Sequence, residues 1–467
     1  MKIQSIEMVT AGMLSIAAAT SAAAFHPVRG VRIGSGLEAH SICSAVFVQR
    51  VDAGATHREM VKLLSGPFGN LLQFKVDRAL PGVDASFAGM AHARADFTPG
   101  YGCRLRHRGD NAAPPPLTLS EPPLPDAFGP SDIVTTTDPA LASAIDKVFK
   151  DVPGARLKNV KAVVIVKNGH VVAERYAPGF GVETPLLSWS VAKSFTNAFL
   201  AVLVREGKLK VGQPVGAPEW AKAGDPRGML TVEDLLRMRS GLNVREDASS
   251  TSAVARMLFL TSDMAAFAAN HPLKRRPGTV YEYTSANTMI LDRLIGRTIG
   301  GGPEQMRAFA EHEIFEPLHM SNVTMEFDGA GTVGGASWIY APARGFARFG
   351  ELYLDDGIAP DGRRLLPAGW VAWSRESTLG APYGAGFWTN DGPSEFAAHR
   401  VARGFPKDGF YASGNLGQRV YIVPSQRLVV VRFGYSPPPS FGISDDENLI
   451  KAAIEASRLR PPDVGIK

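Results

Sequence analysis

Two pairs of β-branched segments, one at each end of a long C-terminal region, limit the folds open to this chain. The runs Lys161–Lys167 and His170–Tyr176 are joined by Asn168-Gly169, the dipeptide most typical of a two-residue hairpin. Near the other end, Arg419–Val423 and Arg427–Arg432 flank a short turn and predict a second hairpin. Helical patterns lie between the two pairs. We expect the two hairpins, although distant in sequence, to share one antiparallel sheet. This arrangement predicts an α/β fold of the α+β type.

Apolar residues at helical spacing surround and separate these hairpins. Helices are predicted over residues 139–149, over a strongly apolar stretch from Val191 to Glu206 that ends before Gly207, over residues 231–238 and over about 446–458. The helices are expected to flank the sheet, with a mostly helical subdomain inserted between its strands.

Proline divides the chain into two folded parts. The run Ala113–Pro125 holds too many prolines for a helix or a central strand and is typical of a stiff, extended connector. We therefore predict an N-terminal module over 25–112, a proline-rich linker over 113–130 and a main domain over 131–467. Within the module, Ser44–Val48 has the composition of a short strand.

The first 24 residues have the features of a secretory signal peptide. Lys2 precedes an apolar run that starts at Met8, and three alanines at 22–24 offer a cleavage site. Glu7 offsets the single positive charge, and the run is about long enough for an uncleaved anchor, so cleavage stays open. No later segment is long and apolar enough to span a bilayer. The pattern predicts a periplasmic or secreted protein.

The two cysteines, Cys43 and Cys103, both lie in the predicted module. In an oxidising compartment an even number of cysteines is most simply one disulfide, and two buried thiols are the alternative. A bond that closes a loop of this length would add about 4 kcal/mol of stability in the chain-entropy model.

Composition excludes several classes of function. The net charge is only +5 and the basic residues are dispersed, so a nucleic-acid surface is not expected. His312-Glu313 lacks the second histidine of a zinc-binding H-E-x-x-H motif, and no other ligand spacing appears, so no metal or other cofactor is predicted. No G-x-S-x-G elbow occurs, which argues against an α/β-hydrolase triad.

Ser190 and Lys193 form a serine-x-x-lysine pair at the start of the apolar helix. A spacing of three places both side chains on one helix face, within reach of each other. The helix N-terminus favours developing negative charge and disfavours an ammonium group. Such a pair suits a serine nucleophile activated by lysine, but alone it is frequent by chance and also fits a helix cap beside a solvated lysine.

Two further segments give the pair its context. Pro277–Asn287 contains Tyr283, and Ser413–Gln418 leads into the last hairpin. The order of the three segments resembles the serine β-lactamase and penicillin-binding-protein superfamily, in particular its class C-like branch, which includes esterases and 6-aminohexanoate-dimer hydrolases. The resemblance covers residues 130 to 460 approximately and implies a β-lactamase/transpeptidase-like fold.

That resemblance implies specific roles. Ser190 would be the acylated nucleophile, Lys193 its hydrogen-bonded partner and Tyr283 the proton carrier between nucleophile and leaving group. The backbone N–H groups of Ser190 and Asn415 would form the oxyanion hole. The side chains of free lysine and tyrosine both have pKa values of about 10, so each needs burial or a cationic neighbour to act as a base near neutrality. Because the two side chains would meet around one hydroxyl group, we expect Lys193 and Tyr283 each to lower the other's proton affinity.

The second and third segments also supply candidate substrate-binding residues. Ser285 stands where class C enzymes carry an asparagine, and Asn287 is the alternative for that substrate contact; Ser285 could equally bond the local backbone. Gly414 and Trp388 are assigned to the substrate site, although a tryptophan is more often a packing residue. Ala412 stands where relatives place a cation that meets a substrate carboxylate.

Together these observations predict an exported serine hydrolase that cleaves an amide or ester bond of a small molecule through a Ser190 acyl-enzyme. A non-catalytic binding or sensor module of the cell envelope is the alternative. A β-lactamase or D-alanyl carboxypeptidase ranks lower, because Ala412 supplies no cation. The sequence predicts neither the physiological substrate, nor the oligomeric state, nor the role of residues 25–110.

Overall fold

The computed structural model describes residues 27–117, 128–129, 132–151, 157–247, 252–437 and 443–456. The predicted signal peptide lies outside the described residues, as do residues 118–127 and 130–131 of the predicted linker. No helix in the described ranges is long and apolar enough to cross a membrane.

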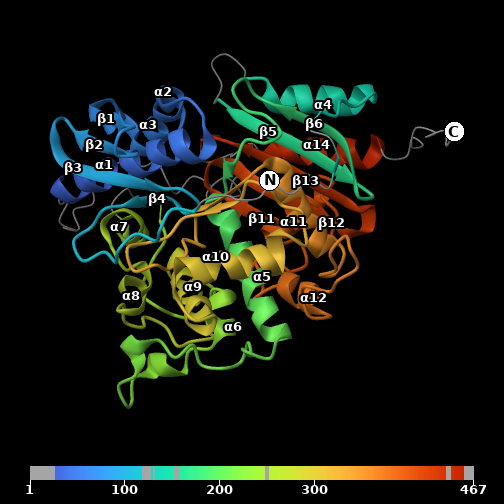
Figure 1. Cartoon of the computed structure of the whole chain (residues 1–467). Coiled ribbons are helices and arrows are strands. Elements are labelled where there is room, and N and C mark those ends of the chain that lie inside the picture. The colour runs from blue at the N-terminus through green and yellow to red at the C-terminus, as the bar shows by residue number, and fades with distance from the viewer. Residues whose placement is uncertain are drawn as a thin grey trace, which may run out of the picture.

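A six-stranded antiparallel sheet forms the centre of the main domain, in the order β10-β11-β12-β13-β5-β6 (Figure 1). Its strands are β5 (Val160–Lys167), β6 (His170–Tyr176), β10 (Trp388–Thr389), β11 (Phe410–Gly414), β12 (Gln418–Val423) and β13 (Leu428–Gly434). Both predicted hairpins are present, and β13 pairs with β5, so the first and last strand pairs of the domain do share one sheet. Asn168 and Gly169 both have positive φ, as the tight β5–β6 turn requires.

Helices cover both faces of this sheet. The helices of the main domain outside the inserted subdomain are α4 (Pro139–Phe149), α5 (Ala192–Arg205), α11 (Ala343–Leu354), α12 (Trp370–Arg375), α13 (Glu395–Ala402) and α14 (Ile443–Ala456). Val163 and Ile165 of β5 pack with α4 and α14 on one face of the sheet. The alternate residues Ala162, Val164 and Val166 pack with α5 and α11 on the other face (Figure 1). Successive side chains of β5 point to opposite faces of the sheet, and both faces are buried along this strand.

Helix α5 runs through the interior of the domain. Every residue from Ala192 to Leu203 is buried, and Phe195 stacks on Phe349 of α11 with ring centroids 3.8 Å apart. The helix ends at Arg205, just before Gly207 with φ +71°. This helix agrees with the prediction, and its burial fixes the position of the serine-x-x-lysine pair at its N-terminus.

A helical subdomain is inserted before the last strands of the main sheet, and it lies below the sheet in Figure 1. It contains α6 (Val232–Leu236), α7 (Ala253–Leu260), α8 (Met264–Ala269), α9 (Ser285–Thr298) and α10 (Gly302–Ala310). A small sheet of order β7-β9-β8 borders it, formed by β7 (Leu186–Leu187), β8 (Thr324–Met325) and β9 (Ile339–Ala341). The predicted α+β architecture with an inserted helical subdomain is thus confirmed.

Residues 27–105 form a separate four-stranded antiparallel sheet packed against a long helix. The helices and strands are α1 (Pro27–Ser44), the π-helical turn η1 (Ala45–Gln49), α2 (Ala53–Thr56), α3 (Lys62–Ser65), β1 (Leu72–Asp77), β2 (Gly82–Phe87), β3 (Met90–Thr98) and β4 (Gly102–Leu105). Its core residues join the same apolar cluster as α5 and α9 of the main domain.

The prediction of a strand at Ser44–Val48 is wrong. These residues are the end of α1 and the turn η1 that continues it. Ala45 and Val48, three residues apart, are both buried, and Phe47 stacks on Phe97 of β3 with centroids 5.1 Å apart. Packing against the sheet at helical spacing outweighs the strand preference of the β-branched side chains.

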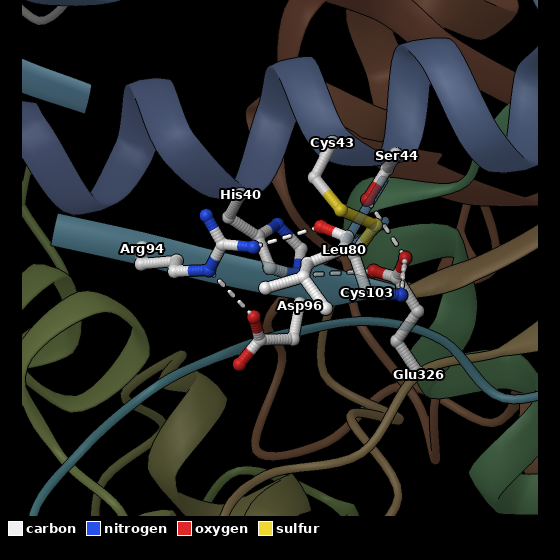
Figure 2. Close-up of a disulfide and its surroundings, with 8 residues drawn as sticks. All are labelled: His40, Cys43, Ser44, Leu80, Arg94, Asp96, Cys103 and Glu326. Atoms are coloured by element: carbon white, nitrogen blue, oxygen red, sulfur yellow. Dashed lines mark hydrogen bonds and ion pairs between the residues drawn. A yellow bond between two sulfur atoms is a disulfide. The ribbon is translucent and has the colours of Figure 1, made fainter. Parts of the chain in front are cut away.

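The predicted disulfide between Cys43 and Cys103 is present and joins the C-terminal end of α1 to β4 (Figure 2). Both cysteines are fully buried.

Candidate active site

Ser190 lies in a short 3₁₀ turn, Trp189–Val191, which leads from β7 into α5. Trp189 has φ +44°, a left-handed conformation that costs about 1–3 kcal/mol in a residue other than glycine. Ser188 anchors this turn: its N–H donates to the Ile339 carbonyl at 3.0 Å, and its hydroxyl donates to the Ser337 carbonyl at 3.2 Å. The surrounding structure therefore holds Ser190 in place while leaving it partly exposed.

Lys193 is 2% exposed, and its amine has three oxygen partners. Its Nζ lies 2.7 Å from Ser190 Oγ, 2.9 Å from Ser285 Oγ and 3.0 Å from the Ala336 carbonyl. An ammonium group can donate to all three. A neutral amine can donate to Ser285 and Ala336 and turn its lone pair to the Ser190 hydroxyl, which is the arrangement of a base.

Burial lowers the pKa of Lys193 to about 8, against the opposing effect of the Glu246 and Asp292 carboxylates. With that value, roughly a tenth of the amine is neutral at pH 7. The shift makes Lys193 a workable base near neutrality, because a catalytic base is most effective when its pKa is close to the working pH.

Tyr283 completes the group around Ser190. Its hydroxyl is hydrogen-bonded to Ser190, and its ring centroid lies 5.1 Å from Lys193 Nζ. Burial, and then the Glu246 carboxylate, raise the pKa of Tyr283 well above its ordinary value. The expectation that the pKa of Tyr283 would be lowered is therefore wrong: loss of solvent is the largest cause of the opposite shift, and the side chain is a neutral phenol that can donate a proton.

The structure brings Ser285 to Lys193, at the first residue of α9. Its N–H donates to Glu246 Oε2 at 2.5 Å, and its side chain is buried. Asn287, two residues further along α9, is fully buried, and its amide contacts Ser240 Oγ at 2.8 Å and Met238 Sδ at 3.6 Å. Both residues thus have partners within the fold, and their predicted substrate contacts stay predictions.

The third segment packs directly against the turn that carries Ser190. Gly414 ends β11, and a Cβ atom there would lie 2.4 Å from the Ser188 carbonyl oxygen and 3.1 Å from Trp189 Cβ, so only glycine allows this approach. Asn415 follows at the start of a 3₁₀ turn. The chain around Asn415 N–H is therefore beside the Ser190 turn, where the resemblance expects an oxyanion-hole donor. Ala412, on the same strand, is 1% exposed.

Aromatic side chains surround Tyr283. The partly exposed Trp388 lies 5.6 Å from it and Tyr383 lies 5.5 Å from it, measured between ring centroids. Trp388 also contacts Tyr383 at 5.2 Å. Trp388 therefore borders the group formed by Ser190, Lys193 and Tyr283 and supports the ring of Tyr283; its predicted contact with a substrate stays a prediction.

Sequence reasoning missed three groups that bond to this site or act on the charge of Lys193. Glu246, in the loop after α6, binds the Ser285 N–H, and no motif marks it. Ala336 supplies only a backbone carbonyl, which no sequence pattern reveals. Asp292 is buried and accepts from Thr196 Oγ1 at 2.7 Å; burial raises its pKa well above the ordinary value. Asp292 lies seven residues after Ser285 on α9 and therefore on the same face of the helix, a spacing from which the sequence could have identified Asp292.

Comparisons with known proteins identify relatives of this chain. A family model described as Beta-lactamase matches residues 145–454. The 6-aminohexanoate-dimer hydrolase of Paenarthrobacter ureafaciens is 24% identical over 334 residues, which cover 66% of this chain and 83% of the relative.

Among solved structures, a candidate 6-aminohexanoate-dimer hydrolase from Bacillus anthracis aligns with a TM-score of 0.55 at 22% identity, covering 72% of this chain and 89% of that one. A penicillin-binding-protein homologue from Caulobacter crescentus gives a TM-score of 0.54 at 19% identity, covering 70% and 100%. These two likenesses show the fold. Since the family model spans more than half of the sequence, the chain belongs to the beta-lactamase family and is a serine hydrolase of the superfamily that also contains the penicillin-binding proteins.

Proposed function

We propose that the protein is an exported hydrolase that cleaves an amide or ester bond of a small molecule through an acyl-enzyme on Ser190. The observation that carries the proposal is the 2.7 Å contact between Lys193 Nζ and Ser190 Oγ, in a buried setting that lowers the pKa of the lysine to about 8. The similarity to 6-aminohexanoate-dimer hydrolase supports the choice of bond.

In the acylation step, neutral Lys193 takes the proton of Ser190 as Oγ attacks the substrate carbonyl. The backbone N–H groups of Ser190 and Asn415 stabilise the negative charge on the carbonyl oxygen. Tyr283 donates its proton to the departing amine or alcohol, and the proton held by Lys193 restores the phenol. The net result is that Ser190 loses one proton, the leaving group gains one, and the acyl group ends on Oγ.

In the deacylation step the same groups work in reverse. A water molecule attacks the acyl carbon, its proton passes to the Tyr283–Lys193 pair, and Ser190 Oγ leaves as it is reprotonated. The product is a carboxylic acid. Apart from the substrate and this water molecule, the proposed steps use only groups of the chain.

Two features support the finer parts of the proposal. The Cys43–Cys103 disulfide suits an oxidising compartment, which favours export. Ala412 places a methyl group where a β-lactamase or D-alanyl carboxypeptidase would need a cation for a substrate carboxylate, which favours a substrate without that carboxylate.

The proposal is tested with a fluorophosphonate probe, which reacts with an activated serine. Wild-type protein should be labelled at Ser190, and Ser190→Ala and Lys193→Ala should both lose labelling almost completely, because the two residues act as one unit. A panel of esters and short amides should then identify turnover, with little hydrolysis of nitrocefin. Unlabelled wild-type protein would favour the non-catalytic alternative, and efficient nitrocefin hydrolysis would favour a β-lactamase.

A further inference from the structure

The carboxyl group of Glu326 belongs to the main domain but is buried against the N-terminal sheet and helix. Its Oε1 accepts from Ser44 Oγ at 2.7 Å and from the Cys103 N–H at 2.8 Å. Its Oε2 lies 3.0 Å from His40 Nε2, and the Tyr340 hydroxyl is also hydrogen-bonded to the carboxyl group. Figure 2 shows Ser44, Cys103 and His40 around Glu326, beside the disulfide.

Residues next to this contact leave space for the Glu326 side chain or pack around it. Gly102, next to Cys103, has φ +70°, and a Cβ atom there would lie 2.5 Å from Glu326 Cγ. The imidazole of His40 is buried and lies against the indole of Trp338, with ring centroids 4.2 Å apart. A carboxyl group removed from water needs such partners, and here they come from α1 and β4. The contact therefore fixes Glu326 firmly to the N-terminal part of the chain.

The backbone of Glu326 is hydrogen-bonded to both ends of a short segment, which we call the Gly334–Trp338 turn. The Gly334 N–H donates to the Glu326 carbonyl at 2.8 Å, and the Glu326 N–H donates to the Trp338 carbonyl at 3.0 Å. Within the turn, the Trp338 N–H donates to the Gly334 carbonyl at 2.7 Å. Glu326 is thus hydrogen-bonded to both ends of the turn, while the Asp292 carboxyl group accepts from the Gly335 N–H within it.

The Gly334–Trp338 turn presents the Ala336 carbonyl to Lys193 Nζ at 3.0 Å. The same turn accepts the Ser188 hydroxyl through the Ser337 carbonyl, next to the strained residue before Ser190. A displacement of the turn would therefore move both the amine of the base and the anchor of the nucleophile.

We propose that Glu326 is a positioning residue for Lys193, and that the segment Pro27–Leu105 holds Glu326 in place and so forms part of the support of the active site. The inference rests on the proposed catalytic role of Lys193. The inference assigns a function to residues whose role the sequence left open. The disulfide-linked helix and sheet fix the position of the Ala336 carbonyl, which binds the Lys193 amine, through the carboxyl group of Glu326, 282 residues away from Ser44.

The test compares Glu326→Ala with Glu326→Gln and with a matched control, Val83→Ala. Val83 is fully buried on β2 in the same N-terminal sheet and is distant in sequence from the contact. Glu326→Gln keeps an oxygen for Ser44 and Cys103. We expect the rate constant of fluorophosphonate labelling to fall about 100-fold in Glu326→Ala, a loss that a displacement of a catalytic group by about 1 Å can cause. Glu326→Gln and Val83→Ala should each stay within about threefold of wild type.

Thermal unfolding measured on the same samples separates positioning from loss of stability. If Val83→Ala, at an equal or lower unfolding midpoint, lost as much labelling as Glu326→Ala, or if Glu326→Ala labelled at the wild-type rate, the inference would be overturned. Ser44→Ala, which removes one donor and leaves Glu326 in place, is the milder variant should Glu326→Ala not fold. It is expected to slow labelling about tenfold with the substrate KM unchanged.

Crystal structures of wild type and the slowest folded variant give a second readout, independent of turnover. In the variant, the Ala336 carbonyl should lie beyond hydrogen-bond distance of Lys193 Nζ, and an unchanged contact would contradict the inference. If the wild-type protein itself is not labelled, the proposed function fails, but the crystal structures still decide whether Glu326 positions the amine.

Discussion

Ser285 Oγ accepts a hydrogen bond from Lys193 Nζ at 2.9 Å, so the serine of the second motif is a partner of the proposed base. The N–H of the same residue donates to Glu246 Oε2 at 2.5 Å. Ser285 therefore lies between the amine that is to be deprotonated and a carboxylate that favours the charged amine. A residue at this place can influence the rate without any contact with the substrate.

Replacing Ser285 by alanine should lower kcat about tenfold and leave KM nearly unchanged, because a hydrogen bond to the base is lost. Steady-state kinetics on an ester from the panel measures both constants. Thr298→Ala is the matched control, since it removes a hydroxyl from the other end of α9, where it bonds only the local Leu294 carbonyl at 2.8 Å. A raised KM with an unchanged kcat would instead show that Ser285 binds substrate.

The labelling rate of Ser190 should rise with pH and reach half of its maximum near pH 8, because only neutral Lys193 can accept the proton. Glu246→Gln should move this midpoint to lower pH. The carboxylate stabilises the ammonium form, so its removal lowers the pKa of Lys193 further. The glutamine oxygen can still accept the Ser285 N–H. Fluorophosphonate labelling rates between pH 5 and 10 measure the shift, and a midpoint that moved upward would contradict the assignment of Lys193 as the base.

Local signals account for the parts of the fold that the sequence predicted. The Asn168-Gly169 turn, the apolar run of α5 and the even number of cysteines each depend on neighbouring residues or on one simple pairing rule. The three segments of the site could be recognised because their order follows a family pattern. These signals were enough for the sheet, the serine-x-x-lysine contact and the disulfide.

Contacts between distant segments account for what the sequence did not predict. Glu326 binds Ser44 across 282 residues, and the Ala336 carbonyl binds Lys193 across 143 residues, the latter through a backbone atom that every residue type possesses. The helical state of Ser44–Val48 and the raised pKa of Tyr283 both follow from burial, which composition alone does not give.

The Cys43–Cys103 disulfide should stabilise the protein by about 4 kcal/mol in the chain-entropy model, because it closes a loop with a sequence separation of 60. Mass spectrometry of the non-reduced protein should find the bond. Denaturant unfolding of wild type and Cys43→Ser/Cys103→Ser should then differ by roughly that amount. Two free thiols in protein exported to the periplasm would contradict both the bond and the proposed compartment.

Tyr283→Phe is expected to separate substrates by their leaving groups. The variant keeps the ring between Tyr383 and Trp388, so it should fold normally. It loses the hydroxyl, which burial keeps protonated and which is hydrogen-bonded to Ser190.

An amine departs from a tetrahedral intermediate only after it is protonated, so amide hydrolysis should slow by about 10²- to 10⁴-fold, the usual share of a general acid. A p-nitrophenolate anion departs without a proton, so hydrolysis of the p-nitrophenyl ester should fall far less. Measuring kcat/KM for an amide and a p-nitrophenyl ester with the same acyl group isolates this step. Equal losses on the two substrates would mean that Tyr283 acts on Ser190 or on the acyl group, and the proton would then reach the leaving group by another route.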